Sequence, residues 1–293
     1  MFSVVIPAYG STPYLEDCLR GLASQSVAPT EIIVFHTGPH DPTARILPLF
    51  PGVRVVHEDA RQYAGGARNR GAALAGDQWL AFLDCDMVAD RHWLQSLTAS
   101  AARYSTDVLI GSIGRWPVGG IWGLVMWFIE FGSTLPHRRP HTMSSAPSAN
   151  FAIRREIFER AGGFRSDLYA AEDGELFVRL REMGCEVQFI PAARADHIFP
   201  GGAARSLSRL CELGRAAAFL RRHRRLSGSI AVRYPPLAML MPFARLVQMA
   251  RRLVFERGPI LLFLALLPLI FAGLLSWSIG FYKEARRPIY PEI

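Results

Sequence analysis

Short apolar runs alternate with amphipathic segments along the first 200 residues. The amphipathic segments predict helices, among them one over residues 12–24, one over 66–74 and one over 172–183. The apolar runs are rich in β-branched residues and predict strands at 2–6, 31–36, 53–57, 79–83, 107–113 and 187–190. Strands that are apolar nearly throughout and alternate with helices are typical of a mainly parallel sheet covered on both faces. The sequence therefore predicts an α/β domain over residues 1–202.

The hydrophobic pattern changes in the last third of the chain. Residues 258–282 are 25 consecutive uncharged residues, mostly Leu, Ile and Phe. Since a helix needs about 20 apolar residues to cross a bilayer, this stretch predicts a transmembrane helix followed by a short tail, 283–293. A core helix or an oligomer contact is the alternative. Residues 230–250 are apolar but contain Arg233, Arg245 and three prolines, which predicts an interfacial or membrane helix.

Charge is distributed unevenly along the chain. The net charge is +8 overall, but residues 1–202 carry −3 and residues 203–257 carry +10. We interpret 203–229 as a basic amphipathic linker. Basic residues beside an apolar stretch are typical of the cytosolic face of a membrane and of contact with anionic lipids. Nucleic acid is not an expected partner, because the basic stretch lacks the interleaved aromatic residues on which bases stack.

The cysteines and the N-terminus indicate the compartment. The four cysteines are scattered without a Cys-x-x-Cys pair, which disfavours a disulfide scaffold or a cysteine-built zinc site and suits a reducing compartment. The apolar run at the N-terminus is too short for a signal peptide. We therefore expect the protein at the cell membrane, with its α/β domain on the cytosolic side.

Two carboxylates follow the predicted strand 79–83. In an extended chain, successive side chains point to opposite sides, so Asp84 and Asp86 share one side and Cys85 takes the other. Hard oxygen ligands of this kind suit Mg²⁺ or Mn²⁺ bridged to phosphate oxygens. A turn with helix-capping acids is the alternative. Ligands of parallel sheets bind beyond the carboxyl ends of strands, where residues 7–9 and 36–37 also fall.

Taken in order, six segments resemble the family 2 glycosyltransferases, which have the GT-A fold. The resemblance runs over about residues 2–200. The segments are Ser3–Tyr9, Tyr14–Ser26, the glycine-and-Ala-Arg-Asn segment Ala64–Gly71, the Asp-x-Asp motif Asp84–Asp86, Ser148–Arg155 with Ala161–Phe164, and the Glu-Asp motif Glu172-Asp173 with its helix to Gly184.

The resemblance implies a metal-dependent, inverting transfer of a sugar from a nucleotide-sugar. Asp173 would be the general base, supported by Glu172; an acidic first turn that complements the helix dipole is the alternative. Asp86 and His197 would hold the metal, with Asp84 on the metal or the donor ribose. For His197 a purely structural role remains open, and for Arg68 an exposed surface position. Donor contacts would come from Pro7, Ala8, Tyr9, His36, Thr37, Arg68, Asp84, Cys85 and Asp86.

The chain departs from the family after its second strand. Members usually carry acids there that contact the nucleotide base, in a pattern like Val-Asp-Asp-Gly-Ser, whereas this chain has His36 and Thr37 before Gly38. Either neutral hydrogen bonds hold the base, or the donor nucleotide differs from the usual uridine type.

The predicted activity is transfer to a lipid-linked or polysaccharide acceptor. One rival is a nucleotidyltransferase, which would need a basic, glycine-rich loop after the first strand; residues 8–12 contain no Arg or Lys. The other is a non-catalytic membrane scaffold in an envelope-polysaccharide assembly, for which the altered residues 36 and 37 are the support.

Overall fold

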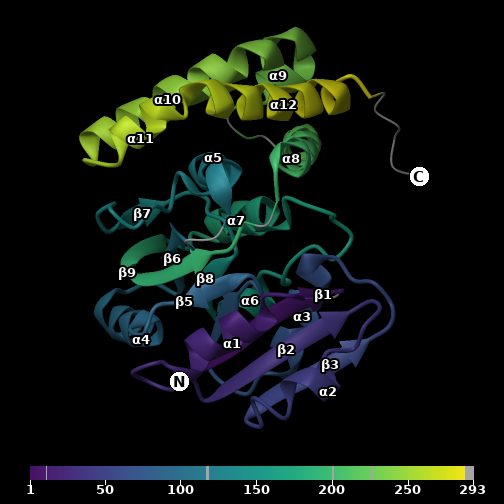
Figure 1. Cartoon of the computed structure of the whole chain (residues 1–293), viewed down its shortest axis with the longest axis vertical. Helices are drawn as coiled ribbons and strands as arrows, with labels where there is room; N and C mark the ends of the chain where they lie inside the picture. The colour runs from purple at the N-terminus through teal and green to yellow at the C-terminus, as the bar shows by residue number, and fades with distance from the viewer. Residues whose placement is uncertain (11, 117–118, 200, 225, 227, 288–293) are drawn as a thin grey trace. The chain divides into compact units, whose positions relative to one another are not determined.

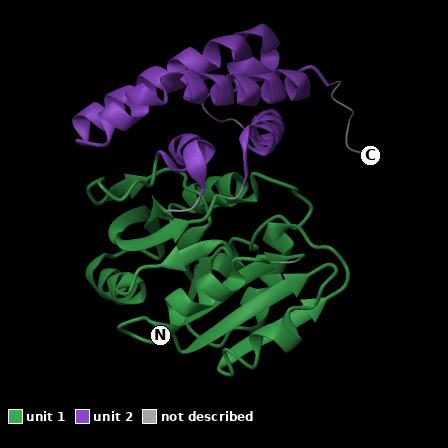
Figure 2. Ribbon diagram, in the orientation of Figure 1, with its two compact units in different colours: residues 1–118, 133–199 green, residues 119–132, 200–293 purple. Residues whose placement is uncertain are grey.

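A computed structural model describes residues 1–10, 12–116, 119–199, 201–224, 226 and 228–287. The chain divides into two compact units, coloured separately in Figure 2. Unit 1 comprises residues 1–118 and 133–199, and unit 2 comprises residues 119–132 and 200–293. The C-terminal part of the predicted tail, 288–293, lies outside the described residues.

A nine-stranded sheet runs through unit 1 (Figure 1). Its order is β3-β2-β1-β4-β8-β6-β9-β5, with β7 paired to β9. The strands are β1 (Phe2–Tyr9), β2 (Glu31–Thr37), β3 (Val53–Glu58), β4 (Trp79–Leu83), β5 (Met87–Ala89), β6 (Val108–Arg115), β7 (His141–Met143), β8 (Asn150–Arg154) and β9 (Val187–His197).

The sheet is mixed. Strands β1 to β4 pair in parallel, as do β6 and β9, whereas β8 is antiparallel to both β4 and β6. The predicted α/β class is confirmed, and the parallel arrangement holds through the N-terminal half. Insertion of β8 between β4 and β6 reverses the strand direction there.

Six helices of unit 1 accompany the sheet among the described residues: α1 (Leu15–Ala23), α2 (Thr43–Ile46), α3 (Ala64–Leu74), α4 (Trp93–Arg103), α6 (Arg155–Arg160) and α7 (Glu172–Glu182).

Helix α3 lies directly on β1 because residue 71 has no side chain. A Cβ atom at Gly71 would lie 2.5 Å from Cγ1 of Val5, closer than any two carbon atoms pack. This contact fixes the height of α3, and with it Arg68, above the sheet.

Two strands extend beyond their predicted ends. Strand β1 continues through Pro7 to Tyr9 by pairing with β2. Strand β4 pairs with β1 only as far as Val5, so the strand tolerates a proline, which has no amide hydrogen to donate, at position 7. Strand β9 continues past residue 190 to His197 by pairing with β6 after an irregularity between Gly111 and Ser112. Both extensions carry the chain to the edge of the sheet where the predicted site residues lie.

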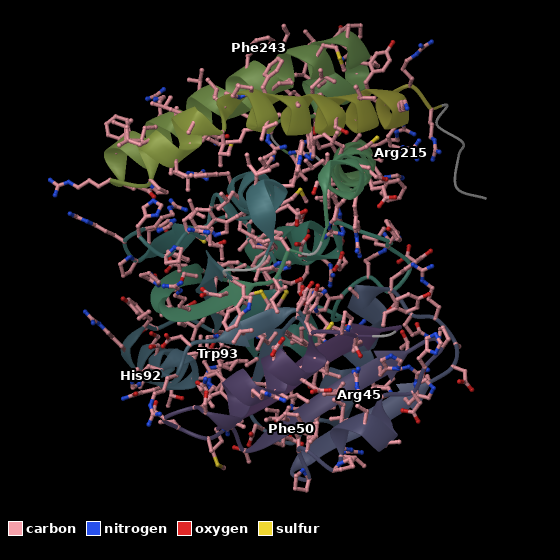
Figure 3. All side chains as sticks on the ribbon, in the orientation of Figure 1. Arg45, Phe50, His92, Trp93, Arg215 and Phe243 are labelled. Carbon is pink, nitrogen blue, oxygen red and sulfur yellow. The ribbon has the colours of Figure 1, made fainter. Side chains whose placement is uncertain are left out.

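A buried polar residue ties three strands to a helix. Asn150 is fully buried and donates to the carbonyl oxygens of Ser112 on β6 and Ala193 on β9, at 2.9 Å each. Its Oδ1 accepts from Nε1 of Trp93, labelled in Figure 3, at 2.8 Å. A buried amide group without hydrogen-bond partners would destabilise the fold, so these bonds fix the register of β8 beside the end of β4, which Asp84 follows.

Unit 2 is helical in the part that the structure describes. Its helices are α5 (Gly120–Phe131), α8 (Ala203–His223), α9 (Ile230–Arg233), the 3₁₀ helix η1 (Pro235–Leu240), α10 (Met241–Phe255), α11 (Ile260–Ala265) and α12 (Leu267–Ala285). Helices α8 and α12 cross at two glycines: a Cβ at Gly214 would meet the carbonyl oxygen of Trp277, and one at Gly280 that of Cys211, each at 1.9 Å. The predicted linker 203–229 is therefore mostly a packed helix.

The C-terminal predictions need correction. The single helix expected over 258–282 is wrong: α11 ends at Ala265, and α12 begins at Leu267 with Pro268 in its first turn. Proline lacks an amide hydrogen and clashes with the preceding turn, so the helix breaks there. The segment 230–250 is likewise divided into α9, η1 and α10, with two prolines opening η1.

Among the described residues, no helix combines the length and the hydropathy that crossing a bilayer requires.

Gly71→Ala tests the contact between α3 and β1. Alanine favours a helix by about 1 kcal/mol over glycine, but its methyl group overlaps Val5. We expect a net loss of about 1–3 kcal/mol in the free energy of unfolding, measured by urea denaturation. Gly52→Ala is the matched control, because a Cβ there has no neighbour within 4 Å. Equal stability of the two variants would contradict this packing.

Candidate active site

The predicted site residues gather at one edge of the sheet in unit 1. The motif Asp84–Asp86 follows β4, Tyr9 ends β1, and Thr37 ends β2, all parallel strands. His197 ends β9, which pairs with β5 just after the motif: Met87 lies opposite His197. Glu172 and Asp173 begin α7. The carboxyl ends of parallel strands thus collect the polar groups, as in other α/β proteins.

Arg68 on α3 connects two of the predicted motifs. Its Nη2 donates to Oδ1 of Asp84 at 2.6 Å, and its Nη1 donates to Oε1 of Glu172 at 2.8 Å. The Arg68 side chain is 4% exposed, Asp84 27% and Glu172 11%. Burial alone would lower the pKa of Arg68, but the two carboxylates raise it above its ordinary value. Arg68 is therefore a permanently charged, buried bridge, and the surface-arginine alternative is wrong.

The neighbouring Asn69 connects two segments of the family pattern, Ala64–Gly71 and Ala161–Phe164. Its Nδ2 donates to the carbonyl oxygen of Phe164 at 2.7 Å, and its Oδ1 accepts from the Phe164 amide at 2.8 Å. The ring of Phe164 in turn lies 5.3 Å from the Arg68 guanidinium. Residues 68 and 69 thereby fix the turn after Gly163 beneath the buried arginine.

Asp86 and His197 form the candidate metal centre. Nε2 of His197 lies 3.5 Å from Oδ1 of Asp86, and the two side chains are 13% and 33% exposed. Oδ1 of Asp84 is already bonded to Arg68, whereas Asp86 and His197 place a carboxylate and an imidazole side by side. The role of Asp84 on the metal or the donor ribose stays a prediction.

These residues fit a divalent cation that is completed by its substrate. Within the described ranges, no group of three or more His, Cys, Asp or Glu side chains is arranged as a metal cage. Mg²⁺ is commonly held by one or two carboxylates together with substrate phosphates and water. A partly exposed carboxylate with an imidazole 3.5 Å away matches that donor set, so Mg²⁺ or Mn²⁺ bound with a diphosphate fits this site.

Cys85 lies between the two aspartates and is chemically inert. Burial, followed by the charges of Asp86 and Asp84, raises the pKa of its thiol well above the ordinary value. Since the thiolate is the form that ligates metals and attacks carbon, Cys85 does neither at neutral pH. Its predicted contact with the donor stays untested.

Asp173 has the properties of a general base. Burial, and next the charge of Glu172, raise its pKa to about 7. Its Oδ1 accepts a hydrogen bond from the amide of Gly174 at 2.6 Å, and the preceding Ala171 has a left-handed backbone, φ 68°, which is strained for alanine. A carboxyl group whose pKa lies near neutrality is deprotonated in a large fraction of molecules at neutral pH, and its carboxylate is basic enough to accept a proton from a substrate. The helix-dipole interpretation alone does not account for a raised pKa, since a helix N-terminus lowers it.

His36 and Thr37 hold a backbone turn. Both side chains are fully buried. Nε2 of His36 lies 2.7 Å from the carbonyl oxygen of Gly10, which has a positive φ of 68°, and the Gly10 amide donates to the carbonyl oxygen of Thr37. A carbonyl only accepts, so Nε2 of His36 carries the hydrogen. The histidine thus fixes the turn after β1, and its predicted contact with the donor stays untested.

His57 is a polar residue of this edge that the sequence analysis missed. Its Nδ1 lies 2.9 Å from Nδ1 of His36, and its Nε2 lies 3.1 Å from Oδ1 of Asp59. Because Nε2 of His36 donates, its Nδ1 accepts, and His57 must be the donor between them. Burial lowers the pKa of His36, which keeps that ring neutral. The sequence held a usable signal: both histidines end neighbouring predicted strands, and the parallel register pairs them.

Tyr9 is the exposed residue of the β1 end. It is 48% exposed, and the guanidinium of Arg61 lies 4.7 Å from its ring centroid. Pro7 and Ala8 are buried within β1. Of the three predicted donor contacts on this strand, Tyr9 alone presents its ring to solvent.

A mixed α/β sheet that gathers acids, a buried arginine and a carboxyl group of perturbed pKa at its strand ends is typical of an enzyme active site. The family model for glycosyl transferase family 2 matches residues 3–162, which is more than half of the chain. The chain belongs to this family.

Curated relatives match parts of the chain. Glycosyltransferase AglE of Haloferax volcanii is 25% identical over 194 residues, covering 64% of this chain and 63% of that protein. Pre-mycofactocin glycosyltransferase of Mycobacterium tuberculosis is 29% identical over 151 residues, covering 50% of this chain and 32% of that protein. The matches thus span from about a third to less than two thirds of these relatives.

Solved structures share the fold over nearly the whole chain. The mannosyltransferase PcManGT of Pyrobaculum calidifontis, in complex with GDP-Man and Mn²⁺, superposes with a TM-score of 0.63 at 19% identity, covering 96% of this chain and 86% of that one. TarS of S. aureus in complex with UDP-GlcNAc gives 0.57 at 16% identity, covering 97% and 90%. The predicted GT-A fold is confirmed.

Removal of the Arg68 charge should destabilise the site. Arg68→Gln leaves two carboxylates facing each other without a cation, so we expect a loss of about 3–5 kcal/mol in the free energy of unfolding. Glu172→Gln in the same chain should restore part of the loss, which a double-mutant cycle measures. Arg70→Gln, on the same helix but 60% exposed, is the control and should change stability by less than about 0.5 kcal/mol. Additive effects at 68 and 172 would contradict the bridge.

Proposed function

We propose that this protein is a metal-dependent, inverting glycosyltransferase. It transfers a sugar from a nucleotide-sugar to a lipid-linked or polysaccharide acceptor at the cytosolic face of the cell membrane. The observation that carries the proposal is the Arg68 bridge, which ties Asp84 of the donor-side motif to Glu172 beside Asp173. A donor site and a base are thereby held in one rigid frame.

Asp173 is the proposed base in a single displacement. Inversion requires one group that takes the proton of the acceptor hydroxyl while the sugar–phosphate bond breaks. The pKa of about 7 at Asp173 makes its carboxylate both available and basic. Glu172, held by Arg68, maintains that pKa through its negative charge. Arg68 opposes the shift, so the balance of the two neighbours sets the working pH.

Asp86 and His197 are the proposed residues that hold Mg²⁺ or Mn²⁺. The cation supplies positive charge that stabilises the leaving nucleoside diphosphate. Mn²⁺ in the PcManGT complex supports a divalent metal in this fold. The nucleotide-sugars in the PcManGT and TarS complexes, GDP-Man and UDP-GlcNAc, support the donor class and leave the base and sugar of this chain open.

The proposed membrane contact rests on unit 2. Helix α10 exposes Phe243, Val247 and Val254, and α11 exposes Leu261 and Leu264, each by more than half of its surface. A helix that exposes a row of apolar side chains and also carries arginine residues is typical of helices that lie in the membrane interface. Contact with lipid brings the chain to a surface on which a lipid-linked acceptor is confined.

A donor panel tests the activity. The full chain is incubated with Mn²⁺ or Mg²⁺, a membrane lipid extract and a set of nucleotide-sugars, and release of nucleoside diphosphate is followed. Release of diphosphate with sugar in the lipid fraction supports the proposal. Release of pyrophosphate from sugar phosphate and nucleoside triphosphate would indicate a nucleotidyltransferase, and silence across the panel would indicate a scaffold.

Asp173→Asn should abolish transfer and change its pH dependence. In the unsubstituted protein we expect kcat/KM to rise about tenfold per pH unit up to about pH 7 and then to level off, because the base must be deprotonated. The variant should lose at least about a hundredfold in kcat at pH 8. Steady-state rates at pH 5 to 9 measure both; a variant with unchanged rates would remove Asp173 from the base role.

The same variant should gain stability at high pH. The pKa of Asp173 is raised in the folded protein, so ionisation costs folding free energy as pH rises from about 4 to about 7. Asparagine has no such cost. We expect a higher melting temperature for Asp173→Asn at pH 8, with a difference that shrinks as pH falls toward 4.

Asp86→Asn and His197→Ala should weaken the binding of the metal. Chelation with EDTA should stop transfer by the unsubstituted protein, and added Mn²⁺ or Mg²⁺ should restore it. Each variant should need at least about tenfold more Mn²⁺ for half-maximal rate. His92→Ala is the control, since its exposed ring, labelled in Figure 3, lies on the loop before α4. Transfer that persists in EDTA would contradict a metal centre.

A further inference from the structure

We propose that His57 is a positioning residue for the nucleotide-sugar, which holds the turn after β1 through His36 and, when protonated, also holds the loop after β3. The chain of groups formed by Gly10, His36, His57 and Asp59 is named here the histidine clamp. It lies in unit 1 at the carboxyl ends of β1, β2 and β3, which are neighbouring strands of the sheet (Figure 1). The proposal rests on the proposed function in that the donor binds at this edge.

The hydrogen-bond partners of the clamp fix where its hydrogens lie. Nε2 of His36 donates to the carbonyl oxygen of Gly10 at 2.7 Å, so Nδ1 of His36 accepts from Nδ1 of His57 at 2.9 Å. Nε2 of His57 faces Oδ1 of Asp59 at 3.1 Å, and a carboxylate only accepts. His57 therefore needs a hydrogen on both ring nitrogens. All three hydrogen bonds exist together only when His57 is an imidazolium.

Loss of that proton breaks the outer hydrogen bond of the clamp and leaves the inner ones. The Asp59 side chain is 99% exposed, so water can replace its hydrogen bond at little cost. His36 is fully buried, and two nitrogen lone pairs facing each other there would be costly. Neutral His57 thus keeps its hydrogen on Nδ1. Since its side chain is 17% exposed, solvent can exchange the outer proton in the range in which histidine titrates, about pH 5 to 8.

Other charged groups face the two histidines from neighbouring elements. The carboxylate of Asp41, in the loop before α2, attracts either ring when it is protonated. The charge of Arg45 on α2, labelled in Figure 3, acts against protonation of His36. Glu58 follows His57 directly and takes the opposite side of β3. Within the clamp, the nearest carboxylate to His57 is therefore that of Asp59, and the added proton belongs on His57.

The two ends of the clamp hold exposed residues of the sheet edge. The turn at Gly10 follows Tyr9, whose ring lies so close to Gly38 that a Cβ there would be 2.7 Å from Cε2 of the ring. The loop after Asp59 carries Arg61, whose guanidinium lies 4.7 Å from the ring centroid of Tyr9. Ligands of parallel sheets bind at this edge. Tyr9 and Arg61 thus offer a ring and a cation to the donor, and the clamp holds both in place.

Nucleotide-sugar binding tests the clamp in the full chain. The probes are UDP-GlcNAc and GDP-Man with Mg²⁺, measured by calorimetry between about pH 5.5 and pH 8. His57→Asn keeps an amide donor for His36 but cannot gain a proton. We expect this variant to bind like the unsubstituted protein near pH 8 and about threefold more weakly near pH 5.5, the size of one exposed ion pair. An equal pH dependence of the two proteins would overturn the proposal.

Two further variants complete the comparison. His57→Leu leaves Nδ1 of the buried His36 unpaired, so we expect binding to weaken at least about tenfold at every pH; binding equal to that of the unsubstituted protein would overturn the clamp. His40→Asn is the matched control, because His40 is exposed at the same edge and its left-handed backbone, φ 72°, suits asparagine. It should keep the unsubstituted pH dependence. The same change at 40 and 57 would overturn the clamp in favour of diffuse surface charge.

The ring tautomers separate positioning from a general loss of structure. NMR of labelled histidine nitrogens should show the His36 hydrogen on Nε2 in the unsubstituted protein and in His57→Asn, and a mixture of tautomers in His57→Leu. A hydrogen on Nδ1 of His36 in the unsubstituted protein would overturn the clamp alone. Absence of binding by both probes would instead overturn the proposed function, because the tautomer is measured without any nucleotide.

Discussion

The ion pairs of Arg68 are the interaction on which the candidate site depends. A single buried cation joins Asp84, at the end of a central strand, to Glu172, at the start of α7. Without it, two carboxylates would face each other away from water. Helix α3 can carry the arginine to that position only because Gly71 allows it to rest on Val5. Packing at one glycine and charge at one arginine are therefore parts of the same constraint.

The two units bury charge in different ways. In unit 1, the buried Arg68 is neutralised by carboxylates on both sides, and its pKa is raised. In unit 2, the buried Arg245 has Arg221 as its charged neighbour, and its pKa is lowered. The first arrangement places a buried cation between two carboxylates, whereas the second places two cations near each other.

Several sequence predictions failed where long-range packing outweighed a local pattern. The apolar stretch 258–282 predicted one helix, but Pro268 divides it, and α12 is then covered in part by α8 through Gly214 and Gly280. The basic run 203–229 was interpreted as an amphipathic linker, but residues 203–223 form helix α8, which packs closely on α12. The ring of His36 lies between Gly10 and His57 and is fully buried, and its contact with the donor stays a prediction.

The sequence by itself determined the α/β class, the strands with their polar ends, and the family motifs, because alternation of apolar runs reports burial and the chemistry of a strand end is local. It could not show that Arg68 meets Glu172, which is 104 residues away, or that the pKa of Asp173 is raised. The ion pair and the pKa shift both depend on the position of the helices on the sheet, to within about an ångström. Only the tertiary structure decided them, since a hydrogen bond and the desolvation of a charge depend on distance and enclosure, which no local pattern records.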